Sequence, residues 1–437
     1  MALLDQILEN HTSFLESLKH RFLDDKRKAA LQKFAELGFP TKKDEEYKYT
    51  NLAEIVKKDY NFFPTNEHHI TKEQIDELHL GEENFDYIVF VNGELHKELS
   101  KISIANIEML SFNHALNDEK HKAVFDKYFN TIALENNTFV DLNDGYCKFG
   151  FFLHVPKNTV IEKPIHVFYL SQNQQENTFY NTRNLLIVEE NSKVEVIESH
   201  HNFDESFTFT NSVTEIFVYP NAKADWHKLQ NDSDTSYLID NTYAKQEKDS
   251  LATVNTFSFG GKLVRNNLDF IQNGSNINSF MNGITVIDKD QLVDHHTAVH
   301  HNQPNCESYQ NYKGIFGGKS HGVFNGKVFV DKIAQKTNAY QQNNNILLSE
   351  GSSIDTKPQL EIFADDVKCS HGCTVGQLDK DAMFYLRARG ISKNEAQALL
   401  LYAFANDAMQ NIDIEPLKLK ISKLLAEKLG VDLIIEE

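Results

Sequence analysis

The stretch Val188-Glu189-Glu190-Asn191-Ser192-Lys193-Val194 decides the fold, because a degenerate copy, Val218-Tyr219-Pro220-Asn221-Ala222-Lys223-Ala224, follows about 30 residues later. The same pattern recurs at residues 155–161, 271–277 and 348–354. Each copy places Asn or Gly between two apolar positions. Asn and Gly accept a left-handed backbone that other residues resist, so each copy predicts a strand, a corner and a new strand.

The zone from about residue 135 to 370 shows no helical periodicity. It consists of short runs of Val, Ile, Phe and Thr that alternate with polar residues. Repeated strand–corner–strand units predict a β-solenoid, in which each coil buries its inward side chains against the coils above and below. A large β-sandwich with similar turns is the alternative, but sandwiches seldom repeat a corner at near-constant spacing. We therefore predict a mainly β protein with a β-solenoid core domain over residues 135–378.

An N-terminal, mainly helical domain is predicted for residues 1–134. The stretch Asp86–Gly93 within it predicts a strand that ends in an Asn-Gly turn. The first segment carries an apolar stripe at helical spacing. Its members are Leu4, Leu8, Leu15, Leu18 and Phe22.

A C-terminal helical domain is predicted for residues 379–437. Asp379–Arg389 predicts a helix closed by Gly390, the capping box Ser392–Glu395 opens a second helix, and Leu417–Leu429 predicts a third. Such helices either cap the open sheet edges at the end of a solenoid or present a docking face. The second helix carries a predicted apolar stripe of Ala396, Leu399, Leu400, Ala403 and Phe404.

The composition excludes several classes of partner. The chain has 437 residues, 41% of them hydrophobic, and a formal net charge of −19, which repels nucleic acids and anionic membranes. No run approaches the roughly 20 apolar residues that a membrane helix needs, and the N-terminus lacks the features of a signal peptide. Four cysteines in a chain of this length do not suggest a disulfide framework. We therefore expect a cytoplasmic protein with free thiols.

Motifs typical of common enzyme classes are missing from the sequence. Gly314–Ser320 resembles a phosphate-binding loop, but Lys313 stands where that motif requires a glycine. No H-E-x-x-H or G-x-G-x-x-G pattern occurs. Sugar-cleaving β-solenoids are an alternative class, although they generally act outside the cell and the chain shows no export signal. We expect that the chain is not an enzyme by itself.

The segment Asp365–Gly376 places two thiols and an imidazole within five residues, at Cys369, His371 and Cys373. If this segment is extended, the three side chains point to one face, because side chains alternate along a strand. Cysteine and histidine together suit iron and zinc. Three ligands spread along one strand cannot close a tetrahedral site, so a second strand or a second chain must complete it. Packing of small buried thiols is the structural alternative.

Other candidate groups are assigned structural roles. Alternation along a strand places His296 and His300 on one face and His295 and His301 on the other. His321 lies in the same region. Apart from Asp294, no cysteine or carboxylate stands at ligand spacing from these histidines, so a metal site is not expected there. The isolated Cys147 and Cys306 are expected in the core or in turns. Asn343-Asn344-Asn345 predicts a stacked asparagine ladder inside the solenoid.

Several motifs of this sequence, in the right order, resemble the SufB/SufD family of iron–sulfur cluster assembly scaffold proteins. They are Phe324–Val328, Ala334–Asn343, Asp365–Val375 and Phe384–Ile391. The N-terminal stretch Lys43–Leu52 resembles the SufD branch. Gly372 also favours that branch, because SufB-like chains tend to carry glutamate there. The resemblance covers nearly the whole chain.

This resemblance implies a right-handed parallel β-helix between helical ends, in complex with a SufB-like paralogue and a SufC-like ATPase. In the family the β-helices pair near their C-terminal coils and the C-terminal helices dock the ATPase. His371 matches a family histidine at that interface, which is implicated with a cysteine of the paralogue in building a nascent iron–sulfur cluster. The cluster would therefore be held transiently between chains.

One position departs from the family. Many relatives carry a small residue such as alanine where this chain has Cys373. The thiol is an extra ligand, a sulfur acceptor or a neutral replacement. A second hypothesis for the whole chain is a homodimeric β-helical binding protein without a cluster role, and a third is a carbohydrate-active β-helix enzyme.

Overall fold

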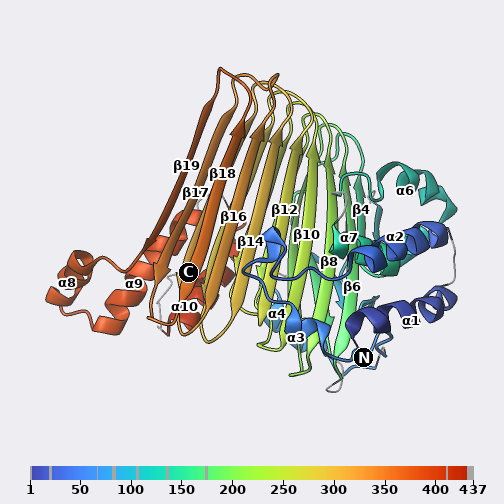
Figure 1. The fold of residues 1–437 in the computed structure, drawn as a ribbon, viewed down its shortest axis with the longest axis horizontal. Helices are drawn as coiled ribbons and strands as arrows, with labels where there is room; N and C mark the ends of the chain where they lie inside the picture. The colour runs from blue at the N-terminus through green and yellow to red at the C-terminus, as the bar shows by residue number, and fades with distance from the viewer. Residues whose placement is uncertain are drawn as a thin grey trace.

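A computed structural model describes residues 2–18, 22–65, 67–80, 85–104, 108–133, 137–172, 176–409 and 412–430. The strands of this part of the chain form two long sheets that face each other along one axis (Figure 1). One sheet runs in the order β19-β17-β15-β13-β11-β9-β7-β5-β1-β2, and the other runs β18-β16-β14-β12-β10-β8-β6-β4-β3. Each strand from β6 to β17 pairs in parallel with the strand two places before it and the strand two places after it. The parallel β-solenoid is confirmed, and the β-sandwich alternative, which needs antiparallel sheets, is wrong.

Successive strands alternate between the two sheets, so two strands and two corners make one coil. Antiparallel pairing occurs at the N-terminal end, between β1 and β2 and between β3 and β4. Asn92 and Gly93 have positive φ and form the predicted turn between β1 and β2. The strands are β1 (Asp86–Val91), β2 (Glu94–Leu95), β3 (Glu108–Ser111), β4 (Phe151–Val155), β5 (Ile165–Ser171), β6 (Thr178–Val188), β7 (Lys193–Asn202), β8 (Thr208–Val218), β9 (Lys223–Gln230), β10 (Ser236–Gln246), β11 (Leu251–Ser258), β12 (Leu263–Gln272), β13 (Asn278–Ile287), β14 (Leu292–His301), β15 (Glu307–Phe316), β16 (His321–Val330), β17 (Asn338–Leu347), β18 (Ser353–Ile362) and β19 (Lys368–Gly376).

Left-handed asparagines form the corners that the repeat predicts. Asn158, Asn191 and Asn221 have φ between 57° and 60°, and their side chains stack, with Asn191 donating to Asn158 at 2.9 Å and Asn221 to Asn191 at 2.8 Å. In the copy at 271–277 the left-handed residue is Asn276. Gly274 of that copy serves close packing instead, because a Cβ atom there would lie 2.2 Å from a backbone nitrogen of the preceding coil.

N-terminal helices cover the outer face of the nine-stranded sheet at the start of the solenoid (Figure 1). In α1 the buried residues are Leu3, Gln6, Ile7, His11, Phe14 and Leu15, whereas Leu8 is 39% exposed, so the predicted stripe is partly wrong. The true stripe starts one residue earlier, at Leu3, and includes the polar His11. The predicted domain boundary between residues 134 and 135 lies outside the described residues. The helices are α1 (Leu3–Ser17), α2 (Asp24–Leu37), η1 (Glu45–Tyr47), α3 (Ala53–Val56), α4 (Lys72–Leu78), α5 (Phe112–Leu116), η2 (Glu119–His121), α6 (Lys122–Tyr128) and α7 (Thr138–Tyr146).

The C-terminal helices α8 (Lys380–Ala388), α9 (Lys393–Asn406), η3 (Asp407–Met409) and α10 (Glu415–Leu429) follow β19. The Ser392 capping box and the left-handed Gly430 stop are present as predicted. The predicted stripe of α9 is partly wrong: Ala396 is buried and Phe404 packs partly buried against an apolar cluster, but Ala403 is exposed. The helix buries Ala396, Ala398, Leu401 and Ala405, and Leu399 is 39% exposed.

These helices pack on a side face of the solenoid. Residues of α9, η3 and α10 share one apolar cluster with outward residues of the ten-stranded sheet, including Ile284 and Ile315. The prediction that they could cap the solenoid end is therefore wrong, because they lie beside the sheet and leave the last strands uncovered. Helix α8 projects away from the body and buries none of its residues (Figure 1).

Candidate functional site

The last coil of the solenoid is open. β18 pairs only with β16, and β19 pairs only with β17, so both end their sheets with a free edge among the described strands. No residue of β18 or β19 is buried, whereas each strand from β4 to β17 contains buried residues. An uncovered sheet edge offers unpaired backbone donors and acceptors to another chain. This end of the solenoid therefore has one unpaired strand edge on each sheet.

The predicted Cys-His segment forms β19 and lies at this open end. In register, Cys369 stands beside Ala339, His371 beside Gln341 and Cys373 beside Asn343 of β17. The β17 partners are buried inside the solenoid, at 1%, 0% and 3% exposure. Neighbouring residues in register point to the same side of a sheet, so the three β19 side chains share the inward face. The predicted alternation is confirmed, but no further coil covers that face.

The accessibility of the two thiols differs. Cys369 is half-buried against the apolar cluster of Val328 and Ala339, and burial raises the pKa of its thiol. His371 and Cys373 are exposed. Among the described residues no three His, Cys, Asp or Glu side chains form a group that could hold a metal ion.

A chain of buried hydrogen bonds ends at Gln341, the residue beside His371 in the sheet. Thr297 donates to Gln310 Oε1 at 2.7 Å, and Gln341 Nε2 donates to the same oxygen at 3.0 Å. Gln341 Oε1 is buried and has no hydrogen-bond partner within the described chain, and Gln341 is the register neighbour of His371. Gly326 makes room for this amide, because a Cβ atom there would lie 2.2 Å from Gln341 Nε2. Two of the motifs that resemble the family thus meet behind His371.

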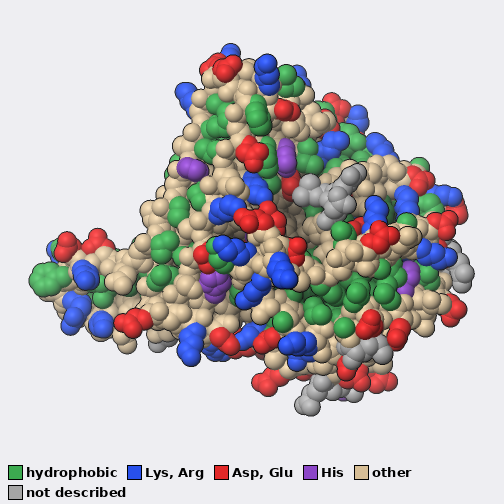
Figure 2. Space-filling model, viewed as in Figure 1, with side chains coloured by type: hydrophobic (Ala, Val, Ile, Leu, Met, Phe, Trp, Pro, Cys, Tyr) green, Lys and Arg blue, Asp and Glu red, His purple; other side chains and the backbone are tan. Residues whose placement is uncertain are grey.

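Apolar side chains flank the open edges. Phe363, just after β18, is 65% exposed, and Val375 on β19 is 47% exposed. A second exposed apolar group lies on α8, where Phe384 and Tyr385 are 74% and 55% exposed. A hydrophobic patch marks the tip of this protrusion (Figure 2). Clustered exposed apolar side chains mark surfaces that bind other proteins.

The histidines on β14 occupy the faces that alternation predicts. His295 is inward and contacts Thr285 at 3.0 Å, and burial lowers its pKa to about 4. His301 is also inward and contacts Ser308 at 2.9 Å. On the outer face, His296 bridges Glu46 and Asp294, and His300 pairs with Asp269. His321 of β16 pairs with Ser353 and Asp355. All five therefore have structural contacts.

Two further expectations concern cysteine and asparagine. Cys147 and Cys306 are buried, as predicted. The stacked ladder at Asn343–Asn345 is wrong, because their register neighbours on β15 are Tyr312, Lys313 and Gly314. Asn343 and Asn345 bond to each other at 2.7 Å instead.

The structure also shows contacts of Lys43–Leu52 that the sequence pattern does not reveal. We call residues 38–52 the strap, since they cross the outer face of the nine-stranded sheet between α2 and α3. Glu46 binds His296 at 3.0 Å and Lys327 at 2.7 Å, and Glu45 binds Lys357 at 2.8 Å. These contacts hold the pKa of Glu46 at about 2. The partners lie more than 200 residues apart, so local periodicity carries no signal of them.

The helices of the described chain include none long and apolar enough to cross a membrane. The fold and the site together define a class of protein: a parallel β-solenoid whose last coil is open and exposes a Cys-His strand. Two family models match: the SufBD protein N-terminal region at residues 3–167 and the SufBD core domain of the SUF system for FeS cluster assembly at residues 169–404.

Curated relatives agree with these models. The chain is 31% identical to an iron–sulfur cluster assembly SufBD family protein of Synechocystis, over 91% of this chain and 89% of the relative. It is 30% identical to the iron–sulfur cluster assembly protein SufD of Escherichia coli, over 97% and 98%. It is 33% identical to the chloroplastic protein ABCI7 of Arabidopsis thaliana, over 59% and 56%. The chain belongs to the SufB/SufD family of iron–sulfur cluster assembly proteins.

Proposed function

We propose that this chain is a non-catalytic scaffold subunit of a cytosolic assembly complex, in which a SufB-like paralogue pairs with the open end of its solenoid. The observation that carries the proposal is the uncovered inward face of β19, which presents Cys369, His371 and Cys373 at the free edge of the ten-stranded sheet. Strands of a second chain would cover that face and add the missing ligands. The nascent cluster is the cargo of this interface, with His371 as its ligand from this chain.

The thiols of β19 take different parts in this proposal. Cys373 is exposed on the same face as His371, which supports a role as an additional ligand or sulfur acceptor. Cys369 is half-buried among apolar side chains, which supports a packing role. His371 is therefore the first residue to test and Cys373 the second.

The C-terminal helices supply the second half of the proposal. Helix α8 buries no residue and exposes Phe384 and Tyr385, so it suits the docking of a SufC-like ATPase. The helix follows β19 after three residues, Gln377–Asp379. Because the two elements are neighbours in the chain, a movement of α8 on the ATPase would act directly on the strand that carries His371.

The experiment is a pull-down of the tagged chain from its native cytosol without oxygen, followed by cluster reconstitution. The proposal predicts recovery of a SufB-like chain and a SufC-like ATPase, and loss of cluster formation in His371→Ala with normal folding. Phe384→Ala with Tyr385→Ala should lose the ATPase and keep the paralogue. Repeated recovery of a homodimer alone, with cluster formation intact in His371→Ala, would favour a homodimeric binding protein. Turnover of a carbohydrate by the purified chain would contradict the non-catalytic assignment.

A further inference from the structure

A small cavity of about 200 Å³ lies where the end of α6 meets the outer face of the nine-stranded sheet. Its lining includes Lys127 and Tyr128 of α6, Phe217 and Tyr219 at the end of β8, and Lys245 and Glu247 at the end of β10. The rings of Tyr128 and Phe217 pack edge to face, with centroids 4.8 Å apart, and join the helix to the sheet. The cavity is smaller than the roughly 300 Å³ at which sites for drug-sized molecules begin, so it suits a ligand of a few heavy atoms.

Lys127 and two tyrosines share one set of hydrogen bonds in this cavity. The Nζ atom of Lys127 donates to the hydroxyl oxygens of Tyr128 and Tyr219 at 2.7 and 3.0 Å, and these two oxygens lie 2.6 Å apart. An ammonium group has three N–H donors and a phenol has one O–H donor, and the set itself uses two N–H groups and one O–H group. One N–H and one O–H therefore have no acceptor among the described residues. The contact between Lys127 and Tyr219 is exposed, so a ligand can reach these donors.

The donors of this set keep their protons at neutral pH. The hydrogen bonds to the two phenol oxygens hold the pKa of Lys127 above its ordinary value, so the amine is charged. Burial raises the pKa of Tyr128 to about 12, so its hydroxyl is protonated. The set consequently offers donors rather than acceptors to a bound molecule.

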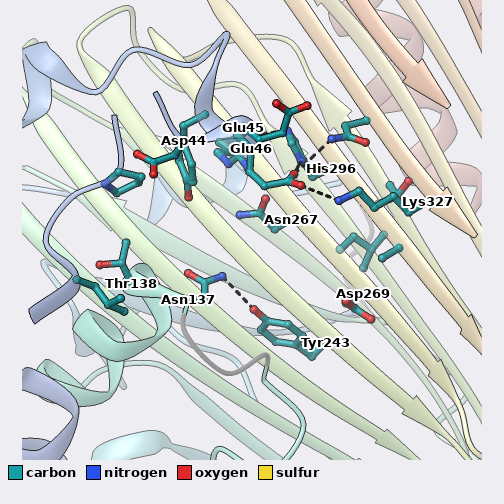
Figure 3. A pocket seen from close by; sticks show the side chains of 18 of the residues that line it. Asp44, Glu45, Glu46, Asn137, Thr138, Tyr243, Asn267, Asp269, His296 and Lys327 are labelled. Atoms are coloured by element: carbon teal, nitrogen blue, oxygen red, sulfur yellow. Dashed lines mark hydrogen bonds and ion pairs between the residues drawn. The ribbon is translucent and has the colours of Figure 1, made fainter. Parts of the chain in front are cut away.

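The lysines of the cavity lack the counter-charge that lysines have elsewhere on this face. Lys327, in the larger cavity beneath the strap, contacts Glu46 at 2.7 Å (Figure 3). Lys127 and Lys245 form no ion pair with a carboxylate in the described part of the chain. Their positive charges are therefore available to a ligand.

One carboxylate also lines the small cavity. Glu247 accepts a hydrogen bond from Asn273 Nδ2 at 3.2 Å. Two ammonium groups thus share the cavity with one carboxylate, which leaves a net positive charge. This surplus of donors and of positive charge disfavours a metal cation and favours an anion.

A tetrahedral oxyanion matches these donors. Phosphate has acceptor oxygens on every side, so it can accept from two ammonium groups and a hydroxyl at once, and lysine is a common phosphate ligand that acts as a point charge. The formal net charge of the chain is −19, which repels anions, so binding of an anion needs a local surplus of positive charge such as this one.

We propose that this cavity binds a free tetrahedral oxyanion of the phosphate class, which accepts hydrogen bonds from Lys127, Lys245 and one of the two tyrosine hydroxyls. The bound ion would connect α6 to β8 and β10 and so stabilise the N-terminal helices on the solenoid. The site goes beyond the scaffold function, because β12, β14 and β16 lie between β10 and the terminal strand β18, and β19 belongs to the other sheet.

Calorimetric titration of the full-length chain with sodium phosphate at constant ionic strength, with sodium chloride as the comparison, tests the proposal. We expect saturable binding of phosphate at millimolar concentrations and no saturation with chloride. Lys245→Met should weaken phosphate binding about tenfold, because it removes a hydrogen bond between charged groups. Lys319→Met makes the same change of charge at the corner between β15 and β16, outside the cavity, and should alter binding less than about twofold. Glu247→Gln should tighten phosphate binding, since it removes the negative charge of the lining.

Three results would overturn the proposal. They are the absence of saturable phosphate binding, equal weakening in the two lysine variants, and weaker binding in Glu247→Gln. Tighter binding of O-phosphoserine than of inorganic phosphate would overturn the assignment to a free ion.

Thermal unfolding provides the check on folding. Phosphate should raise the Tm of the unchanged chain and raise that of Lys245→Met less, because a ligand of the folded state stabilises it by mass action. If Lys245→Met fails to fold, Lys127→Met is the second variant, since Lys127 is exposed. The proposal then requires weaker phosphate binding in that variant, and unchanged binding would overturn it.

Discussion

The middle coils and the last coil of this solenoid share the same alternation of side chains, but the inward residues are buried in the middle coils and exposed in the last coil. On β14, the inward His295 is covered by the next coil, contacts Thr285, and has a pKa lowered to about 4 by burial. On β19, the inward His371 has no coil above it and is exposed. The same residue type on the same kind of face is a packing element in one place and an accessible side chain in the other. Position along the stack decides which.

In the covered coils of the solenoid, buried charged side chains pair with one another. Arg183 of β6 contacts Asp144 at 2.7 Å and Glu215 at 2.6 Å, and all three side chains are buried. Charges in such a place are stable only as a set. Ion pairs near the open end, such as Glu45 with Lys357, are exposed and contribute little.

The largest expected effect is therefore at Arg183. Arg183→Met should lower the free energy of unfolding by about 3–5 kcal/mol, because it leaves the buried Asp144 and Glu215 without a counter-charge. Urea unfolding measures the change. Lys357→Met near the open end is the control and should cost less than about 1 kcal/mol. An equal decrease in the free energy of unfolding in the two variants would show that the buried ion pairs of the covered coils are no more important for stability than the exposed pairs near the open end.

The next effect is a dependence on pH at His295. Its pKa is lowered from 6.5 to about 4, so between these values the unfolded chain binds a proton that the folded chain does not. Above pH 6.5 the neutral His295 imidazole costs no stability. As the pH falls from 6.5 to 4, the free energy of unfolding decreases by up to about 3 kcal/mol because of this residue. Urea unfolding at pH 7 and pH 5 should show a smaller acid loss in His295→Gln than in the unchanged chain. An identical acid loss in both would mean that the imidazole is not buried.

A third effect links the interior to the open end. Gly326→Ala should lower the free energy of unfolding by about 1–3 kcal/mol, because the added Cβ atom would lie 2.2 Å from the Gln341 amide. The double variant Gly326→Ala with Gln341→Ala should regain part of the loss, since it removes the clashing group. Purely additive losses in this double-mutant cycle would show that the amide does not occupy this place.

The smallest effect on stability is expected at β19 itself. His371→Ala should change the free energy of unfolding by less than about 0.5 kcal/mol, because the side chain is exposed and packs against no further coil. Denaturant titration checks this. A loss above about 2 kcal/mol would show that His371 is part of the core, and the reading of the last coil as an open site would fail.

The sequence predicts much of this fold because the corners carry a local signal. Asn158, Asn191 and Asn221 stand where the backbone must turn left-handed, and few other residues do so at low cost. The alternation on β14 and β19 follows from strand geometry alone, so the faces of His295 and of His371 are predictable.

Contacts between residues far apart in the sequence cannot be predicted from local sequence patterns. The strap binds the sheet through Glu46 and Thr50, whose partners are His296, Lys327 and Asp294. Nothing in the spacing of these residues shows that they meet. The buried face of α9 also depends on which strands it covers, and its apolar residues are too evenly distributed to define one stripe. That the C-terminal helices lie beside the sheet rather than over its end is likewise a result of tertiary packing.

Amide hydrogen exchange of the full-length chain, alone and with the SufB-like paralogue, tests the central claim most directly. In the chain alone, β19 should exchange much faster than β17, because one edge of β19 is free. Addition of the paralogue should slow exchange across β18 and β19 and leave β13 and β14 unchanged. Binding of the paralogue with no added protection on either terminal strand would contradict the account and place the docking surface elsewhere.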